Sequence, residues 1–414
     1  MLVIVFFTKT CYNNETMENL DNKDKKNTIK PHEATKTAGN LINLGHVFVD
    51  ISQGAFPALI PFLKSIFSMT YSQVGIMLLI QSLTSSICQP LFGYISDKSS
   101  KSWFISVGIL LSAVAMGAIV WAPNYAVLII LISISGFGSA IFHPQAMKAT
   151  NRISPAEKKG EKMGIFSLGG NFGYALGAFL MGLLLTLPGD FQNTKYIAIP
   201  GMIFFVVLMF FNKYLNMATH AGDKHASKTS SGKIPYGFIC VLVCFIFMRS
   251  TAYQAINTFT PLFHVNFMNE NSMFTGNYVS IFSVAGVFGT YYGGILSDKI
   301  GRRKIICTSM FLTVPLMMFM PFARGIYALI IAGLAGFVVV ASYSSTFVMA
   351  QEVMKDNMGL AGGLTAGFAI GLGGVGATVL GNLADMITLP VLMQWFWILP
   401  LCAGLMTWLF PKDK

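Results

Sequence analysis

The stretch Gly93-Tyr-Ile-Ser-Asp97-Lys98 occurs a second time, late in the chain, as Gly294-Ile-Leu-Ser-Asp298-Lys299. Each copy follows a long apolar run and ends it with the same Gly-x-x-Ser-Asp-Lys turn. Pro61 and Pro261, near the ends of two other apolar runs, keep almost the same offset. The sequence therefore predicts that one structural half is present twice.

The composition indicates an integral membrane protein. Of the 414 residues, 54% are apolar and only 11% are charged, whereas soluble domains have about 25% charged residues. Apolar runs close to the ~20 residues that a helix needs to cross a bilayer recur along the chain. We place them at 38–63, 73–95, 103–122, 124–149, 163–187, 196–215, 235–262, 276–296, 304–321, 325–350, 359–386 and 390–410. The predicted fold is an all-α membrane protein with twelve transmembrane helices in two pseudo-symmetric six-helix bundles.

The basic residues are concentrated in alternate loops. If both termini are cytoplasmic, Lys64, Lys195 and Arg324 lie outside, Arg249 falls within a span, and the other 24 of the 28 Lys and Arg lie inside. Because cytoplasmic loops carry such an excess of positive charge, we expect a multi-pass protein of the cytoplasmic (inner) membrane with both ends inside. Membrane orientation therefore explains the net charge of +11, and no nucleic-acid partner is expected.

A polar segment containing Gly, Ser and Lys separates the two halves, and its composition is typical of a flexible linker. We expect a disordered cytoplasmic tail at 1–37, a first bundle at 38–215, a cytoplasmic linker at 216–234, a second bundle at 235–410 and a short cytoplasmic tail at 411–414.

Ionisable groups within the spans are the strongest functional signal, because a charge in hydrocarbon is costly. In the first span Asn43, His46, Asp50 and Gln53 are spaced by three and four residues and share one helix face. The titratable pair of His46 and Asp50 favours proton coupling. A purely structural hydrogen bond from Asp50 to a neighbouring helix is the alternative.

The seventh span carries Arg249, Tyr253 and Asn257 at the same helical spacing. Aligning the two repeated prolines brings Arg249 within one residue of the position equivalent to Asp50. We expect the two charges to face a shared watery chamber and to pair with each other, with substrate or across water. A permanent structural salt bridge is the alternative. The candidate substrate-binding residues of these two spans are Asn43, Gln53, Arg249, Tyr253 and Asn257.

Further polar residues lie in the fourth and fifth spans. His143 precedes Pro144, which loosens the local helix, and histidine titrates closest to physiological pH. A proton-relay or gating role is as well supported as that of a hydrogen-bonded core residue. Gln145 and, in the fifth span, Asn171 are further candidates for substrate binding.

The repeated hairpins are candidate gates at the cytoplasmic ends of the spans. Glycine permits close approach, and the aspartate can cap the next helix or pair with nearby cations. The gating candidates are Gly93, Asp97, Gly294, Asp298, Arg302, Arg303 and Glu352. For Glu352, simple solvation at the interface is an equally good interpretation. Asp385 is assigned no role beyond that of a solvated charge at a helix end.

Other classes of function lack their motifs. No G-x-x-x-x-G-K-[ST] phosphate loop is present, so the chain is not expected to hydrolyse nucleotides. Cys240 and Cys244 share a helix face without neighbouring His or carboxylates, which favours packing over metal binding. We expect no enzyme activity, no cofactor and no metal site.

Several blocks carry a family resemblance. The hairpins resemble the Gly-x-Leu-x-Asp-Arg-x-Gly-Arg-Arg signature of the major facilitator superfamily. The blocks Leu44-Gly-His-Val-Phe-Val-Asp50, Gly138-Ser-Ala-Ile-Phe-His143-Pro144 and Gly169-Gly-Asn-Phe-Gly-Tyr-Ala-Leu-Gly177 are similar to the fosmidomycin resistance protein family. That resemblance implies an exporter that exchanges a drug or metabolite for protons. Members typically have Glu where this chain has Gln145, so proton coupling here would depend more on Asp50 and His143.

The sequence thus predicts a monomeric secondary transporter in the lipid bilayer, moving a small polar or anionic compound by alternating access, with proton-coupled efflux as the first hypothesis. Proton-coupled uptake of a nutrient or iron-chelate uses the same architecture and is the alternative. A non-transporting membrane sensor is a third possibility, but no sizeable soluble module accompanies the spans.

Overall fold

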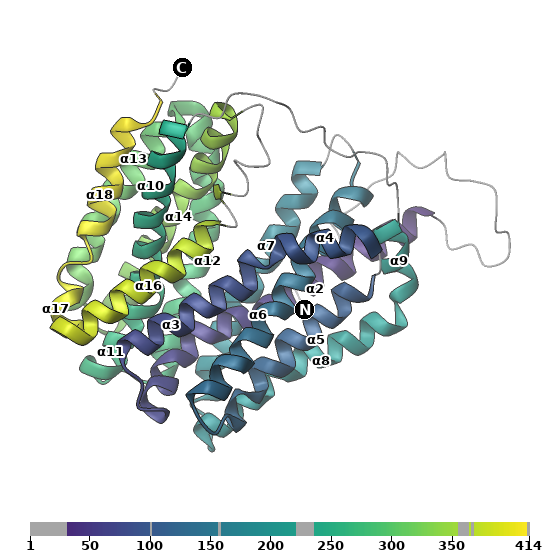
Figure 1. Cartoon of the computed structure of the whole chain (residues 1–414), viewed down its shortest axis with the longest axis horizontal. Helices are drawn as coiled ribbons and strands as arrows, with labels where there is room; N and C mark the ends of the chain where they lie inside the picture. Colours follow the sequence, from purple (N-terminus) through teal and green to yellow (C-terminus); the bar gives the residue numbers. More distant parts are fainter. Residues whose placement is uncertain are drawn as a thin grey trace.

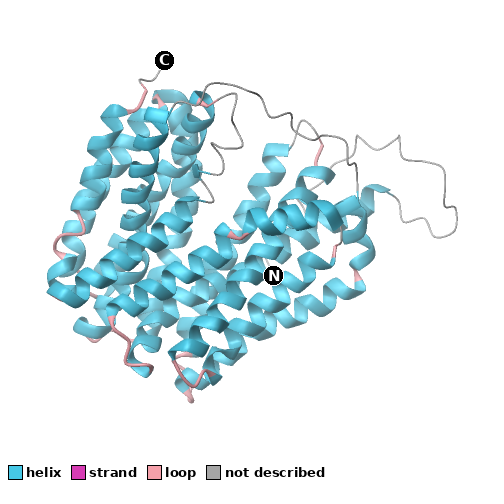
Figure 2. Ribbon diagram, viewed as in Figure 1, coloured by secondary structure: helices cyan, strands magenta, loops and turns pink. Residues whose placement is uncertain are grey.

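The computed structural model describes residues 31–99, 102–155, 159–220, 236–354, 364–365 and 368–411. These segments are helices joined by short loops, without a strand (Figure 2). Twelve of the helices are long and apolar enough to cross a membrane, which confirms the predicted all-α class and the number of spans. Of the predicted tails and linker, residues 1–30, 221–234 and 412–414 lie outside the described residues.

The first six spans are formed by α2 (Pro31–Ile66), α3 (Tyr71–Ser82) with η1 (Leu83–Ile87) and α4 (Gln89–Ser99), α5 (Trp103–Ala118) with η2 (Ile119–Trp121), α6 (Tyr125–Ile153), α7 (Lys159–Leu184), and η4 (Asp190–Ile197) with α8 (Ala198–Phe210). The short α9 (Asn212–His220) follows them. Helix α2 begins earlier than the predicted span, and α9 extends into the segment predicted as linker.

The last six spans are formed by α10 (Tyr236–Gln254) with η5 (Ala255–Phe259) and α11 (Thr260–Met268), α12 (Ser272–Ile300), α13 (Arg302–Phe319) with η6 (Met320–Phe322), α14 (Gly325–Val353), α16 (Phe368–Ile387), and α17 (Leu389–Met393) followed by α18 (Ile398–Met406) and η9 (Thr407–Leu409). In Figure 1 this half lies beside the first half, and α3 and α16 lie where the two meet.

Local sequence signals explain several helix ends. Asn124 and Asn271 precede α6 and α12, and each side chain accepts a hydrogen bond from the backbone N–H three residues later. Thr70 and Gln73 form a reciprocal capping box at the start of α3. These side chains satisfy backbone donors that a helix N-terminus leaves without an internal partner.

Glycines bring α2 and α7 into close contact, and this contact positions the polar residues of the first span. A Cβ atom placed on Gly173 or Gly177 would collide with the backbone carbonyl of Val47 or Ile51, and one placed on Gly54 would collide with that of Tyr174. Because small residues at four-residue spacing let backbones approach, α7 can lie directly against the polar face of α2.

Several contacts join the two halves. The Ser280 hydroxyl of α12 donates to the carbonyl of Ala175 in α7 at 2.7 Å, and the Thr378 hydroxyl of α16 donates to the carbonyl of Gly75 in α3 at 3.1 Å. Gly374 of α16 also packs closely on α3. The interface therefore consists mainly of helix pairs α7–α12 and α3–α16, which cross from one bundle to the other (Figure 1).

Candidate functional site

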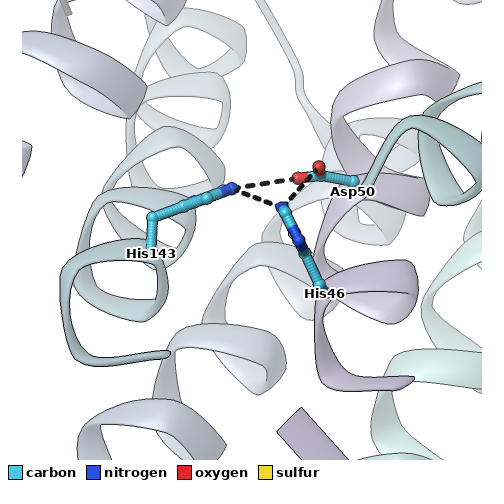
Figure 3. A group of neighbouring side chains, drawn as sticks. All are labelled: His46, Asp50 and His143. Atoms are coloured by element: carbon cyan, nitrogen blue, oxygen red, sulfur yellow. Dashed lines mark hydrogen bonds and ion pairs between the residues drawn. The ribbon is translucent and has the colours of Figure 1, made fainter. Parts of the chain in front are cut away.

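Three ionisable side chains from two helices of the first half form a compact cluster (Figure 3). Helix α2 supplies His46 and, one turn later, Asp50, and α6 supplies His143 just before Pro144. His46 Nε2 lies 3.2 Å from Asp50 Oδ2, and His143 Nε2 lies 3.6 Å from Asp50 Oδ1. The two Nε2 atoms are 3.1 Å apart. The three residues assigned to proton coupling from the sequence are thus brought together in space.

The other ring nitrogens determine what the cluster can do. His46 Nδ1 lies 2.7 Å from the carbonyl of Phe166, and His143 Nδ1 lies 2.8 Å from the carbonyl of Ser139. A carbonyl oxygen only accepts hydrogen bonds, so these two contacts favour the tautomers in which Nδ1 carries the proton, although the Ser139 hydroxyl also lies 3.2 Å from His143 Nδ1. In the neutral rings both Nε2 atoms then present lone pairs to each other and to the Asp50 carboxylate.

Lone pairs at these distances repel one another unless something positive lies between them. One proton on either Nε2 converts that ring to a donor, which can then hydrogen-bond the carboxylate or the other imidazole. The arrangement can thus accommodate a proton or another cation between the three side chains.

The residues packed around the cluster hold its side chains in place but leave it partly exposed. The Phe166 ring stacks on His46 with centroids 4.0 Å apart and an interplanar angle of 24°. Gly170 of α7 packs so closely that a Cβ atom there would collide with the His46 ring and the Asp50 carboxylate. The side chains of Asp50 and His143 nevertheless remain 15% and 16% exposed, so small species can reach them.

Arg249 is held separately, in the second half. Its side chain is almost fully buried, with 1% of the residue exposed. Its guanidinium lies over the Tyr343 ring at 4.0 Å, and Nη1 donates to the Thr346 hydroxyl at 3.2 Å. Nε has no hydrogen-bond partner among the described residues. No ion pair joins Arg249 to Asp50 within the described part of the chain, so the permanent salt bridge considered above is not formed there.

Tyr174 links the regions around the two charges, and sequence reasoning missed it. This α7 tyrosine lies near enough to Asp50 and to Tyr253 to interact with both side chains. Asn257 Nδ2 donates to the Tyr174 hydroxyl at 3.0 Å. Tyr253 in turn packs beside Tyr343, the residue beneath Arg249, with ring centroids 6.2 Å apart. The only sequence signal for Tyr174 was its position among the regularly spaced glycines of α7.

The remaining candidates for substrate binding differ in their burial. Gln53 is buried and accepts a hydrogen bond from Gln81 Nε2 at 2.5 Å. Asn43 and Gln145 are buried as well, on α2 and α6. Asn171 lies on an exposed face of α7, where it donates to the Ser167 carbonyl at 3.1 Å. No contact described here brings Asn171 to the cluster.

The second hairpin forms the ion pairs that its charges suggest. Arg302 Nη1 lies 2.9 Å from Asp298 Oδ1, and Arg302 Nε lies 2.9 Å from Glu352 Oε2. Arg303 donates to the carbonyl of Trp408 at 3.0 Å. Gly294 lies within α12, about two turns before its end, and packs against the Ser344 side chain. In the first hairpin Gly93 packs on Pro144, whereas the side chain of Asp97 lies outside the described residues.

Asp385 does more than was expected of it. Its carboxylate accepts hydrogen bonds from the backbone N–H groups of Tyr71 and Ser72, at 2.8 and 2.7 Å, and from the Ser72 hydroxyl. The assignment of Asp385 as a merely solvated end charge therefore omitted a contact between α16 and α3.

Comparison with known proteins supports one family throughout. The family model described as Major Facilitator Superfamily matches residues 42–411. The chain is 28% identical to the fosmidomycin resistance protein of Escherichia coli over 378 residues, which cover 90% of this chain and 92% of that protein. It is also 28% identical to the uncharacterized MFS-type transporter YfnC of Bacillus subtilis over 396 residues, or 94% and 96% of the two chains.

Solved structures show the same fold. A bacterial homolog of the human lysosomal transporter Spinster, in an inward-facing and occupied conformation, superposes with a TM-score of 0.76 at 12% identity, over 92% of this chain and 97% of that one. The nucleoside transporter NupG superposes with a TM-score of 0.71 at 13% identity, over 91% and 100%. These relatives are transporters, not enzymes. The twelve spans and the family match over nearly the whole chain together show that this protein is a multi-pass membrane transporter belonging to the major facilitator superfamily.

Proposed function

We propose that the protein exports a small polar or anionic compound in exchange for protons, with the cluster of His46, Asp50 and His143 as the proton site. The observation that carries this proposal is the convergence of two Nε2 lone pairs and a carboxylate within 3.6 Å of one another. A proton on either Nε2 can be hydrogen-bonded by the carboxylate or by the other imidazole, and the partial exposure of Asp50 and His143 gives small ions access to the group.

Arg249 supports the choice of substrate class. A guanidinium that is nearly fully buried, with one N–H left without a partner among the described residues, is poised to receive an anionic or strongly polar acceptor. Its planar face is already fixed by Tyr343, so the remaining donors are oriented before the substrate arrives. The names of the relatives, which include fosmidomycin and quinolone resistance proteins, favour export.

Exchange follows from competition for the same lone pairs. A substrate can place an acceptor on Arg249 and a hydrogen-bond donor at the cluster, where the donor bonds to the Nε2 and carboxylate lone pairs. In the absence of substrate, a proton binds to the same lone pairs. Tyr174 and Tyr253 lie between the two regions and can transmit the change. Proton and substrate then occupy the transporter alternately, which is the requirement for antiport.

Reconstitution into liposomes tests the proposal. With an imposed pH gradient, fosmidomycin and a quinolone serve as first probes, and transport is followed by substrate flux and by an internal pH dye. Asp50→Asn should abolish exchange driven by the pH gradient but retain substrate counterflow, because that variant removes the carboxylate of the proton site without removing Arg249. Arg249→Gln should lose counterflow itself.

Asp190→Asn, which removes a carboxylate from the exposed end of η4, is the matched control and should behave like the unmodified protein. Normal proton-driven flux in Asp50→Asn would refute the proton site. Accumulation of a compound inside cells along an inward proton gradient would instead establish uptake by symport.

A further inference from the structure

We propose that His46, Asp50 and His143 also form a binding site for one divalent transition-metal cation, with Zn²⁺ as the reference ion. Each residue offers one ligand atom, and these three atoms lie within 4.8 Å of one another. Neither the family match nor the named relatives assign a metal to this position.

The separations among the ligand atoms suit a single central ion. Zn²⁺ bonds to imidazole nitrogen and carboxylate oxygen at about 2.0–2.2 Å in a tetrahedral arrangement, which places neighbouring ligand atoms about 3.3–3.6 Å apart. The Nε2–Nε2 distance here is 3.1 Å, His46 Nε2 lies 3.2 Å from Asp50 Oδ2, and His143 Nε2 lies 3.6 Å from the other carboxylate oxygen, Oδ1. An ion bound to one carboxylate oxygen requires a rotation of the Asp50 carboxylate, because the three ligand atoms, one from each residue, lie within 4.8 Å of one another.

The hydrogen-bond partners of the two histidines are also typical of a metal site. Metal-bound histidines usually donate their second ring N–H to a carbonyl or carboxylate, which fixes the tautomer and the ring orientation. Both rings do so here, to the backbone carbonyls of Phe166 and Ser139. In the neutral tautomer that these carbonyls favour, each ring directs the lone pair of Nε2 toward Asp50.

The ligand types indicate the class of ion. Two imidazoles and one carboxylate suit Zn²⁺, Co²⁺ or Ni²⁺, whereas Mg²⁺ and Ca²⁺ favour sites built from oxygen. The carboxylate supplies one negative charge, and the partial exposure of Asp50 and His143 gives the ion an entry path and leaves a position for water. Gly170 keeps a side chain out of this space.

The sequence did not predict this site because its ligands are distant in the chain. His46 and His143 are separated by 97 positions, and the His-x-x-x-Asp pair within the first span is not a distinctive metal motif by itself. Only the packing of α6 beside α2 brings the second imidazole to the pair.

Direct binding to the full-length protein tests the inference, with any polyhistidine tag removed. CoCl₂ is titrated into protein in detergent or nanodiscs while its visible absorption is recorded, and ZnCl₂ is then added as competitor and measured by calorimetry. We expect saturable binding of one ion, displaced by Zn²⁺. Asp50→Asn and His143→Gln should each weaken binding by about tenfold or more, whereas the control His264→Gln, in the second half, should leave it unchanged.

X-ray absorption at the Zn edge provides a test without any variant, in case a substitution prevents folding. The expected spectrum contains two imidazoles among the ligands at about 2.0–2.1 Å. Absence of saturable binding, unchanged affinity in both variants, or a bound ion without imidazole ligands would each overturn the site. Because these assays need neither a pH gradient nor a transported compound, their failure is distinguishable from failure of the proposed proton exchange.

Discussion

Asp385 accepts hydrogen bonds from both the backbone N–H and the hydroxyl of Ser72, at 2.7 and 2.5 Å, and so joins the second half of the transporter to the first. The contact lies at the N-terminus of α3, where Thr70 already satisfies the N–H of Gln73. Asp385 adds acceptors for Ser72 and Tyr71. A carboxylate is well suited to this position, because a helix N-terminus carries free N–H donors and a partial positive charge.

This contact should stabilise the state in which the ends of α3 and α16 are together. Asp385→Asn keeps the size of the side chain but removes its charge and one acceptor, so we expect a loss of about 1 kcal/mol, or roughly a fivefold shift toward separation. Spin labels at S65C and M386C, in a background without other cysteines, measure this as a larger population of long distances. Asp190→Asn should leave the distribution unchanged, and an unaltered distribution in Asp385→Asn would show that the cap does not hold the halves together.

Gly170 should be indispensable to the ionisable cluster. Gly170→Ala places a methyl group against the His46 ring and the Asp50 carboxylate, so the rigid cluster must open. We expect proton-driven exchange to fall by tenfold or more, as reacting groups displaced by about 1 Å commonly show. Gly164→Ala on the same helix is the control, because a Cβ atom there meets nothing within 4 Å. Equal activity of the two variants would mean that the cluster geometry is not needed for exchange.

The sequence was sufficient to predict the spans and one face of the site. Hydrophobic runs identified twelve helices because the bilayer forces their length and composition, and the four-residue step placed His46 and Asp50 on one face of α2. It could not identify their partners. The approach of His143 depends on how α6 packs on α2, and the separate burial of Arg249 depends on Tyr343 and Thr346 from α14.

Asp385 is a second residue whose partners the sequence could not identify, and here its role was underestimated. A carboxylate at the end of a span looks solvated in the sequence, and its helix-capping role becomes evident only when α3 of the other half lies beside it. Contacts between elements distant in the chain decide these roles, and helical spacing carries no information about them.

The ion pair between Arg302 and Glu352 allows a test of whether Glu352 is part of a gate or is only a solvated charge. Both partners of Arg302 are well exposed, with side-chain exposures of 67% for Asp298 and 52% for Glu352. Exposed pairs of this kind usually contribute less than about 1 kcal/mol and are screened by salt. Glu352→Gln should therefore change the transport rate by less than about fivefold at low ionic strength, and the difference should vanish in high salt. A larger effect that persists in salt would establish that Glu352 itself takes part in coupling.

Tyr174 should couple the proton site to the substrate site. Its hydroxyl accepts a hydrogen bond from Asn257 across the interface between the halves, and the side chain lies near Asp50 and Tyr253. Tyr174→Phe keeps the ring but removes the hydroxyl and its hydrogen bond with Asn257, so substrate counterflow should persist while the number of protons moved per substrate falls. Simultaneous measurement of internal pH and substrate flux in liposomes provides that ratio. Tyr125→Phe, which removes only a hydrogen bond to the carbonyl of Gln73 within the first half, is the control. An unchanged ratio in Tyr174→Phe would show that the two sites communicate by another route.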